Sequence, residues 1–398
     1  MKIAIIAASP RPIPASMGGA TQTMMTHLLD VNEELKQHTF GVFSYFENEA
    51  FTMSKKYEKS TFFYYEPKES LDRIQSLTYR FLRKVSNHKI HLRSNFISYC
   101  AKIINKEGFD VVVLEGNCFQ ANQIRQLISN KLILHMHIDR LNVDLPETLS
   151  IMESVDGIFA ISNFCKERML EVDPGKSKSI VVVKNTIDTE KFTPVGADEC
   201  RDFLNKKFNF NSSDRIITYC GRLVENKGVL ALVKAINSIK SQHVKLMIIG
   251  SSVYLGAKRT SFTERLQNQV GDNKNIVFTG FIKQDQLPTY IKASDLVVVP
   301  SICNEAAGNV IIESLSCGVP VVASTQGGIP EYASEKACSL VPYNDNFINS
   351  LSSAISYLIT HKDEYDVKAS NARSVALSYD KYNYYNNFCS SLKYICNL

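Results

Sequence analysis

The chain of 398 residues lacks the features that mark several classes of protein. No apolar run reaches the roughly 18–20 residues of a membrane-spanning helix, and there is no low-complexity tract. The formal net charge of +5 is too small to indicate a nucleic-acid partner. Residues 1–10 carry one lysine and a short apolar run, which predicts a first β-strand rather than a secretory signal. These absences favour a soluble globular protein of two domains.

Paired cysteine motifs are also missing. The ten cysteines are scattered, and none forms a C-x-x-C pair. Zinc ligation from cysteine normally shows such spacing, so we expect no metal site. Free, buried thiols in a reducing cytosol explain the cysteines best.

Short apolar runs alternate with longer amphipathic segments along the whole chain. Most of the runs are continuously apolar, which is typical of parallel strands buried on both faces. The helical segments between them give repeated βαβ units and an α/β fold. The runs are 2–9, 110–116, 131–137, 157–162, 179–185, 215–221, 244–250, 275–280, 296–301 and 318–324.

The βαβ pattern closes and restarts near residue 190. We therefore predict an N-terminal domain over 1–190 and a C-terminal domain over 191–377, each Rossmann-like. The tail, 378–398, places aromatic residues at helical spacing and has no strand after it. It is expected to form a terminal helix that packs back on the first domain.

Two cations follow the first strand of the second domain. Ligands of doubly wound sheets bind beyond the carboxyl ends of the strands, and Arg222 and Lys227 occupy such a loop. A guanidinium fork and an ammonium group there would suit a diphosphate. A solvated loop with ordinary basic residues is the alternative.

Two glutamates flank a predicted helix start in SICNEAAGNVIIESLSCG. Gly308 and Asn309 lie in its first turn, where free backbone N–H groups and the helix dipole favour anions. Glu305 precedes this turn, and Glu313 shares a helix face with Asn309. Both carboxylates can therefore flank a ligand; alternatively, Glu305 only complements the dipole and Glu313 is a surface residue.

A glycine pair follows the next strand. Gly327 and Gly328 allow close backbone approach, and Pro330 suits the first position of a helix. A lone Gly-Gly is more often a turn than a phosphate loop, but its place after a strand favours a second helix start aimed at the same cleft.

The ordered set of segments GRLVENKG, GFIKQDQL, ASDLVVVPS, EAAGNVIIESLSCGVPVVAS and GGIPE resembles the donor domain of the retaining family 4 glycosyltransferases. The first half of the chain matches more loosely, through 18–28, 135–139, 159–169 and 182–194. The resemblance implies a GT-B fold, in which two Rossmann-like domains with parallel sheets face a central cleft that holds a nucleotide-sugar.

The resemblance also implies roles for the charged residues. Arg222 and Lys227 are expected to hold the donor diphosphate. Glu313 corresponds to the second glutamate of the E-x7-E motif and is expected to bind the ribose, while Glu305 is expected to touch the transferred sugar. His137 is expected near sugar and acceptor, with His135 as the competing assignment because strand alternation puts both on one face. The catalytic set is then Glu305, His137, Arg222 and Lys227.

Backbone groups and an apolar loop complete the donor site that the resemblance implies. Gly18 and Gly19 are expected to approach the phosphate from the first domain. The remaining donor contacts are expected at Phe281 and Ile282 against the base, and at Ala307, Gly308, Asn309 and Val310 against the sugar and phosphate. The small Ala307 departs from the bulkier residue of many relatives and leaves room for an N-acetyl group.

No D-x-D pair of the metal-dependent transferases occurs in the chain. In retaining transferases of this kind the leaving diphosphate itself can accept the acceptor's proton, so stabilising its charge matters more than a nucleophile. The expected enzyme is a retaining, metal-independent transferase with no cofactor beyond its nucleotide-sugar co-substrate.

A basic stretch, 73–106, has eight Lys/Arg residues and no Asp/Glu, interleaved with aromatic residues. Such a face predicts peripheral contact with an anionic membrane, which suits a polyprenyl-diphosphate-linked glycan or a lipid as acceptor. A pair of ordinary helices with solvated faces is an equal alternative.

The predicted function is transfer of a hexosyl or N-acetylhexosaminyl group, most simply from a UDP-sugar, during assembly of bacterial surface polysaccharide: O-antigen, capsule or lipopolysaccharide. We expect the enzyme in the cytoplasm, with the inner face of the membrane as its peripheral site. The alternatives are an NAD(P)-dependent oxidoreductase, which lacks a G-x-G-x-x-G after the first strand, and a non-catalytic nucleotide-sugar-binding protein of the same fold.

Overall fold

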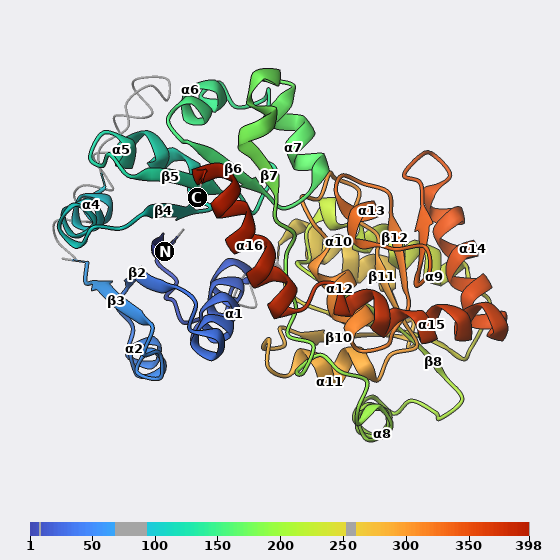
Figure 1. The fold of residues 1–398 in the computed structure, drawn as a ribbon. Helices are drawn as coiled ribbons and strands as arrows, with labels where there is room; N and C mark the ends of the chain where they lie inside the picture. The colour runs from blue at the N-terminus through green and yellow to red at the C-terminus, as the bar shows by residue number, and fades with distance from the viewer. Residues whose placement is uncertain (8, 68–93, 252–259, 398) are drawn as a thin grey trace. The chain divides into compact units, whose positions relative to one another are not determined.

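A computed structural model describes residues 1–7, 9–67, 94–251 and 260–397 (Figure 1). The chain divides into two compact units. Unit 1 comprises 1–161, 165–184 and 384–398, and unit 2 comprises 162–164 and 185–383. The chain thus passes from the first unit to the second at residue 184, where the sequence had suggested a boundary near 190, and its last residues belong to unit 1.

Unit 1 is built on a parallel sheet of seven strands in the order β3-β2-β1-β4-β5-β6-β7. The strands are β1 Lys2–Ile6, β2 Thr39–Tyr45, β3 Ser60–Tyr65, β4 Val111–Glu115, β5 Lys131–His135, β6 Gly157–Ala160 and β7 Ile180–Val182. The helices of the unit are α1 Ala20–Leu35, α2 Asn48–Ser54, α4 Asn95–Glu107, α5 Ala121–Arg125, α6 Thr148–Glu153 and α7 Asn163–Leu170, the last of which begins in unit 2.

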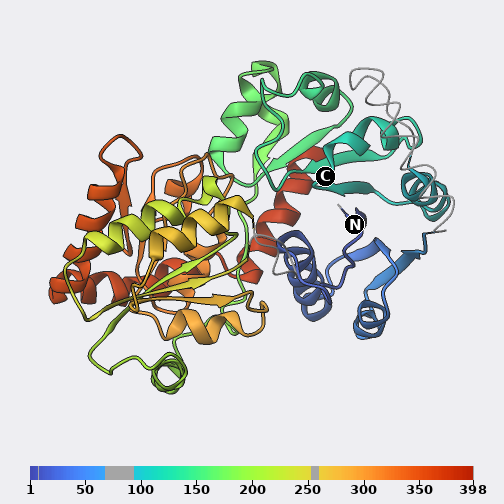
Figure 2. The ribbon, with the colours of Figure 1, turned by 180° about the vertical axis from the view of Figure 1, so that it is seen from behind.

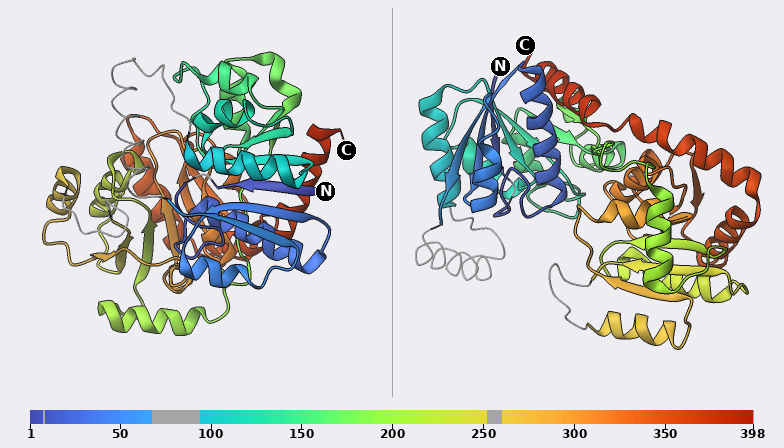
Figure 3. Two further views of the ribbon diagram at one scale, coloured as in Figure 1. Left: turned by 90° about the vertical axis from the view of Figure 1, so that its left-hand side faces the viewer. Right: turned by 90° about the horizontal axis from the view of Figure 1, so that it is seen from below.

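The C-terminal helix α16, Lys381–Cys396, packs on one face of this sheet beside α1. Its Phe388 is fully buried and makes an edge contact with Phe159 of β6. Ile3 and Ile5 of β1 lie in the same cluster as the buried side chains of both helices, because alternate strand residues share a face. Figure 3 shows the two helices running along this sheet.

Unit 2 is built on a parallel sheet of six strands in the order β10-β9-β8-β11-β12-β13. The strands are β8 Arg215–Cys220, β9 Val244–Ile249, β10 Ile276–Gly280, β11 Leu296–Val299, β12 Val321–Ser324 and β13 Cys338–Val341. The helices are α8 Ala197–Phe208, α9 Val229–Ser238, α10 Ser261–Val270, α11 Leu287–Lys292, α12 Asn309–Ser316, α13 Ile329–Tyr332, α14 Phe347–Thr360 and α15 Lys362–Leu377.

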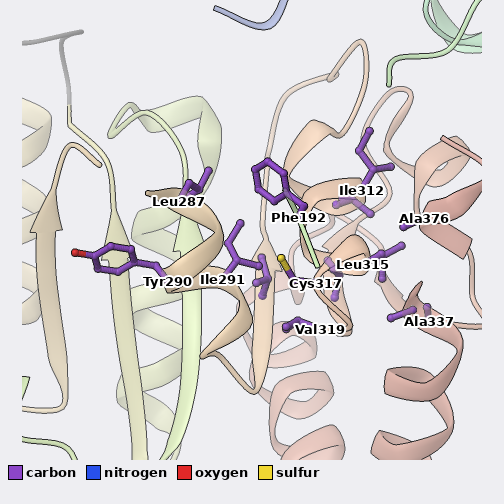
Figure 4. Close-up of a cluster of buried hydrophobic side chains, with 14 of the residues drawn as sticks. Phe192, Leu287, Tyr290, Ile291, Ile312, Leu315, Cys317, Val319, Ala337 and Ala376 are labelled. Carbon is purple, nitrogen blue, oxygen red and sulfur yellow. The ribbon is translucent and has the colours of Figure 1, made fainter. Parts of the chain in front are cut away.

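Helices cover both faces of the second sheet (Figures 1 and 2). On one face α8, α11, α12 and α15 bury Ile216 and Val297, and Figure 4 shows side chains of this cluster. On the other face α9, α10 and α14 bury Ile217 and Val298. Adjacent strand residues therefore face opposite cores, which explains why these runs are continuously apolar in the sequence.

Each sheet reverses its strand order once. In unit 1 the reversal lies between β1 and β4, and in unit 2 it lies between β8 and β11. Ligands of open α/β sheets bind beyond the carboxyl ends of the strands at such a point. The loops that follow β8 and β11 are therefore the first place to look for a site in unit 2.

Candidate functional site

Lys227 and Glu305 meet at the strand reversal of unit 2. Lys227 follows β8, Glu305 follows β11, and the ammonium group of Lys227 donates to Oε1 of Glu305. Ser301 also donates to this carboxylate oxygen, at 2.6 Å. Both charged side chains are partly exposed, so the pair is accessible to a ligand.

The two loops that carry this pair are fixed to each other by their backbones. The amide of Ile302 donates to the carbonyl of Asn226 at 3.0 Å. Gly228 has φ +70, and a Cβ there would lie 1.8 Å from the carbonyl oxygen of Pro300. A glycine is therefore required where α9 begins, and it holds Lys227 beside the loop that contains Glu305.

The glycine pair after β12 packs against Glu305. The amide of Gly328 donates to the carbonyl of Glu305 at 2.7 Å, and Gly327 forms an isolated β-bridge with the same residue. A Cβ on Gly327, at φ +62, would lie 2.4 Å from the Glu305 carbonyl oxygen. Helix α13, which follows, has four residues. Gly327 and Gly328 thus approach the loop that contains Glu305, and their backbone contacts position that residue.

Glu313 lies within α12 and is buried. Its carboxylate accepts a hydrogen bond from Gln284 at 2.9 Å. Burial raises the pKa of Glu313, and the hydrogen bond from Gln284 opposes this shift only in part. The alternative that Glu313 is a solvated surface residue does not hold in this structure.

Helix α12 begins after Gly308, as the sequence predicts. The Oδ1 of Asn309 accepts from the side-chain amide of Asn185 at 2.6 Å, while Ala307 and Val310 pack against the hydrophobic core. The side chains of this turn are thus engaged with the protein. The groups that remain for an anion are the backbone amides at the start of the helix.

Arg222 is exposed, and its guanidinium makes no ion pair with any residue in the described ranges. Its carbonyl accepts from the hydroxyl of Tyr219 at 2.8 Å, which fixes the backbone of this loop. Phe281 follows β10 and is 43% exposed, and the neighbouring Ile282 packs partly against the core. The sequence-predicted residues of unit 2 therefore all follow the carboxyl ends of β8, β10 and β11.

In unit 1, Gly18 and Gly19 precede α1 with φ +66 and +109. A Cβ on Gly18 would meet no atom within 4 Å, whereas one on Gly19 would lie 2.5 Å from Oε1 of Gln22. These two residues allow the chain to enter α1 through a left-handed turn. The first amides of α1 follow directly, after the carboxyl end of β1.

His137 and His135 are turned toward a buried carboxylate that the sequence had not indicated. Nε2 of His137 lies 2.7 Å from Oε2 of Glu115, and Nδ1 of His135 lies 3.2 Å from the same oxygen. Burial opposes ionisation of Glu115, but the charge of His135 and the contacts with both imidazoles lower its pKa to about 2. Burial and the charge of His135 lower the pKa of His137.

Sequence reasoning missed the partners of the site residues: Ser301, Gln284, Asn185 and Glu115. Ser301 and Gln284 lie in loops where a polar residue carries no signal of its own. Glu115 ends an apolar strand, and the strand pattern alone gives no reason for a carboxylate there. A polar residue at the last position of such a strand is the one signal that points to it.

Residues 201–375 match the family described as glycosyl transferases group 1. The matched residues lie within unit 2 and cover less than half of the chain. The chain is 24% identical over 384 residues to the putative glycosyltransferase YtcC of Bacillus subtilis, covering 94% of this chain and 87% of that protein. It is 26% identical over 293 residues to the lipopolysaccharide 1,2-N-acetylglucosaminetransferase of Salmonella typhimurium, covering 72% of each chain.

Solved structures show the fold of this chain. The Anabaena protein Alr3699/HepE, crystallised with UDP, aligns with a TM-score of 0.73 at 17% identity and covers 99% of this chain and 100% of that one. A glycosyltransferase from Rickettsia africae aligns with a TM-score of 0.76 at 18% identity and covers 99% of this chain and 98% of that one. The two Rossmann-like units of this chain therefore have the GT-B fold.

The basic stretch 73–106 lies mostly outside the described residues, which resume at 94 with the turn before α4. Across the described ranges, no helix has both the length and the apolar character needed to cross a bilayer.

Proposed function

We propose that this protein is a glycosyltransferase that moves a hexosyl or N-acetylhexosaminyl group from a UDP-sugar to a glycan or lipid-linked acceptor, with retention of the anomeric configuration. The observation that carries the proposal is the meeting of Lys227 and Glu305 at the strand reversal of unit 2. A cation and a carboxylate stand there beside the amides at the start of α12.

The charges of this site suit a sugar diphosphate. Arg222 and Lys227 offer the positive charge that a diphosphate requires, and the free amides of α12 add a partial positive charge. Glu305 forms an ion pair with Lys227. We propose that an arriving diphosphate takes over Lys227, which leaves the Glu305 carboxylate to accept hydrogen bonds from sugar hydroxyls.

The second carboxylate suits the ribose. Glu313 lies about one helical turn after Asn309, where α12 begins. It is buried, and one of its carboxylate oxygens accepts from Gln284. A buried carboxylate gains most from hydroxyl donors, since burial leaves it with few other partners. We propose that the two ribose hydroxyls supply those donors and that Phe281 and Ile282 lie against the base.

The comparisons support the choice of donor and acceptor class. The Anabaena structural neighbour was solved with UDP and with UDP-glucose, and one relative is a lipopolysaccharide N-acetylglucosaminetransferase. We propose UDP as the nucleotide and bacterial surface polysaccharide (O-antigen, capsule or lipopolysaccharide) as the product. The proposed place of action is the cytoplasm, peripheral to the inner face of the membrane.

A thermal-shift screen of nucleotide-sugars tests the donor. A ligand that binds only the folded state adds about 2.7 kcal/mol to the free energy of unfolding when its concentration is a hundred times Kd. The melting temperature rises as a result. We expect UDP and UDP-sugars to stabilise the protein more than GDP-mannose or NAD+. Stabilisation by NAD+ alone would favour the oxidoreductase alternative, and nucleotide-sugar binding without any transfer or hydrolysis would favour the non-catalytic one.

The proposed transfer needs no metal at the diphosphate, because two side-chain cations and a helix start supply the positive charge. Turnover should persist in excess EDTA. If turnover falls in EDTA, single metal ions are added back. Rescue by Mg²⁺ or Mn²⁺ at millimolar concentration would contradict metal independence of the transfer step. Sedimentation with anionic vesicles separately tests the membrane contact, and the absence of salt-sensitive binding would overturn it.

A further inference from the structure

Glu115, His135 and His137 form a cluster of three metal-ligating side chains inside unit 1. One ligand atom from each residue, all within 4.8 Å of one another, can face a common point. Glu115 and His135 are fully buried, and the side chain of His137 is 9% exposed. This cluster lies outside the residues that the donor proposal uses in unit 2.

The strand pairing of unit 1 creates the cluster. Glu115 is the last residue of β4 and pairs in register with His135, the last residue of β5. His137 follows two residues later, and its ring centroid lies 4.2 Å from that of His135. Alternation along an extended chain places both imidazoles on the same side of the sheet.

The polar atoms of the cluster have too few partners for a finished hydrogen-bond network. Within the described part of the chain, four of them have no hydrogen-bond partner although they are buried: Oε1 of Glu115, both ring nitrogens of His135, and Nδ1 of His137. Buried polar atoms are almost always satisfied by protein, water or an ion, since leaving one unsatisfied costs about 1–3 kcal/mol. An ion that accepts one lone pair from each of the three side chains would satisfy part of this need, and the second nitrogen of each imidazole would stay outside its coordination.

We propose that Glu115, His135 and His137 bind a divalent transition-metal ion of the Zn²⁺ class. Two imidazole nitrogens and one carboxylate oxygen are a set of ligands that Zn²⁺ takes at about 2.0–2.2 Å, with a further position left for water or another oxygen ligand. Nitrogen ligands select against Mg²⁺ and Ca²⁺, which prefer oxygen. The exposed edge of His137 gives the site its access to solvent.

The structure also sets the expected strength of binding. Metal-bound histidines normally donate their outer N–H to a carboxylate or carbonyl, and removing such a partner weakens metal binding about 10–100-fold. Nδ1 of His137 and Nε2 of His135, the ring nitrogens that would be the outer ones, have no such partner within the described residues. We therefore expect an exchangeable site, with an affinity about one to two orders of magnitude weaker than that of a zinc site with complete outer-shell hydrogen bonds.

Equilibrium dialysis of the full chain against Zn²⁺, with metal content measured by mass spectrometry, tests the proposal. We expect roughly one Zn²⁺ per chain, from the one three-ligand cluster among the residues that the structure describes. Glu115→Gln should reduce this content at least tenfold, because it removes the anionic ligand. His243→Gln is the matched control: His243 lies 3.3 Å from Asp214, is largely exposed, and belongs to unit 2, so its loss should leave the zinc content unchanged.

Co²⁺ substitution separates this site from the cysteines. Nitrogen and oxygen ligands give visible d–d bands without the intense near-ultraviolet charge-transfer band of a cobalt–thiolate bond. We expect the unmodified protein to show the d–d bands without the thiolate band. This measurement needs no variant, so the test stays valid even where Glu115→Gln fails to fold. A thiolate band, or no Zn²⁺ bound above the level of a zinc-free control, would overturn the site. Neither result depends on transferase activity, so the metal-site proposal and the proposed function can be overturned independently of each other.

Discussion

Lys227 donates to the same oxygen of Glu305 that accepts from Ser301, so the cation following β8 and the carboxylate following β11 form one unit before any ligand arrives. Neither residue is fixed by its own loop alone. Gly228 and Gly327 each admit a neighbouring backbone that any side chain would displace. The site is therefore held by loop-to-loop contacts beyond the strand ends.

Removing the charge of Lys227 tests the diphosphate clamp. Lys227→Met should weaken UDP binding about 10–100-fold, the range given by hydrogen bonds to charged groups of about 1.5–3 kcal/mol. Isothermal titration calorimetry measures the change. Lys234→Met, an exposed lysine on α9, is the control and should bind UDP like the unmodified protein. Equal loss of affinity in both variants would point to a general charge effect.

Substitutions of the two glutamates should affect different quantities, turnover for Glu305 and nucleotide affinity for Glu313. Glu305→Gln keeps an acceptor for Ser301 but removes the charge that faces the sugar, so turnover should fall about 10²–10³-fold with UDP affinity nearly unchanged. Glu313→Ala should chiefly weaken nucleotide binding. Steady-state kinetics and calorimetry on both variants make the comparison, with Glu225→Gln in the Lys227 loop as control. Equal effects on UDP affinity would contradict the divided roles.

Stability should depend on pH through Glu313. Burial raises its pKa above the ordinary value of 4.5, so the folded state binds more protons than the unfolded state once the pH exceeds that value. The free energy of unfolding contributed by this group therefore falls as pH rises from 4.5 through the folded pKa. Glu313→Gln should flatten this decline in urea unfolding experiments. A variant with the same pH slope as the unmodified protein would show that Glu313 does not cause it.

Gly228→Ala should destabilise the protein more than its backbone angle alone explains. The left-handed φ costs an alanine about 1–2 kcal/mol, and the clash with the Pro300 carbonyl adds to it. Gly108→Ala is a fair comparison, since that glycine has φ +64 and its Cβ would meet no atom within 4 Å. Urea unfolding of the two variants should give a clearly larger loss for Gly228. Similar losses of unfolding free energy in the two variants would mean that the loops containing Gly228 and Pro300 move apart to accommodate the added methyl group.

The fold, and the position of the charged residues beyond the strand ends, could be predicted from the sequence for a physical reason. Strands buried on both faces must be continuously apolar, so a run such as Leu296–Val299 can be recognised in the sequence, and the loops after such strands carry the charged residues. Glu305 and Lys227 were predicted in this way. Their direct pairing was not, because it depends on how two loops 78 residues apart approach each other.

The cluster in unit 1 shows what a linear pattern cannot contain. His135 and His137 were considered as alternatives, although one strand face holds both. Glu115 lies on a neighbouring strand, and only the register of β4 against β5 brings it to them. Ligands contributed by separate strands have no fixed spacing in sequence, so the expectation of no metal site rested on cysteine spacing and the missing D-x-D pair alone.

The most direct test of the central claim compares UDP with uridine by isothermal titration calorimetry. We expect the strongest contacts of the donor to be those of its diphosphate with Lys227, Arg222 and the start of α12. UDP should therefore bind at least about 100-fold more tightly than uridine, since two or more charge-assisted contacts are involved. Equal affinity for UDP and uridine, or binding of NAD+ without binding of UDP, would contradict the account.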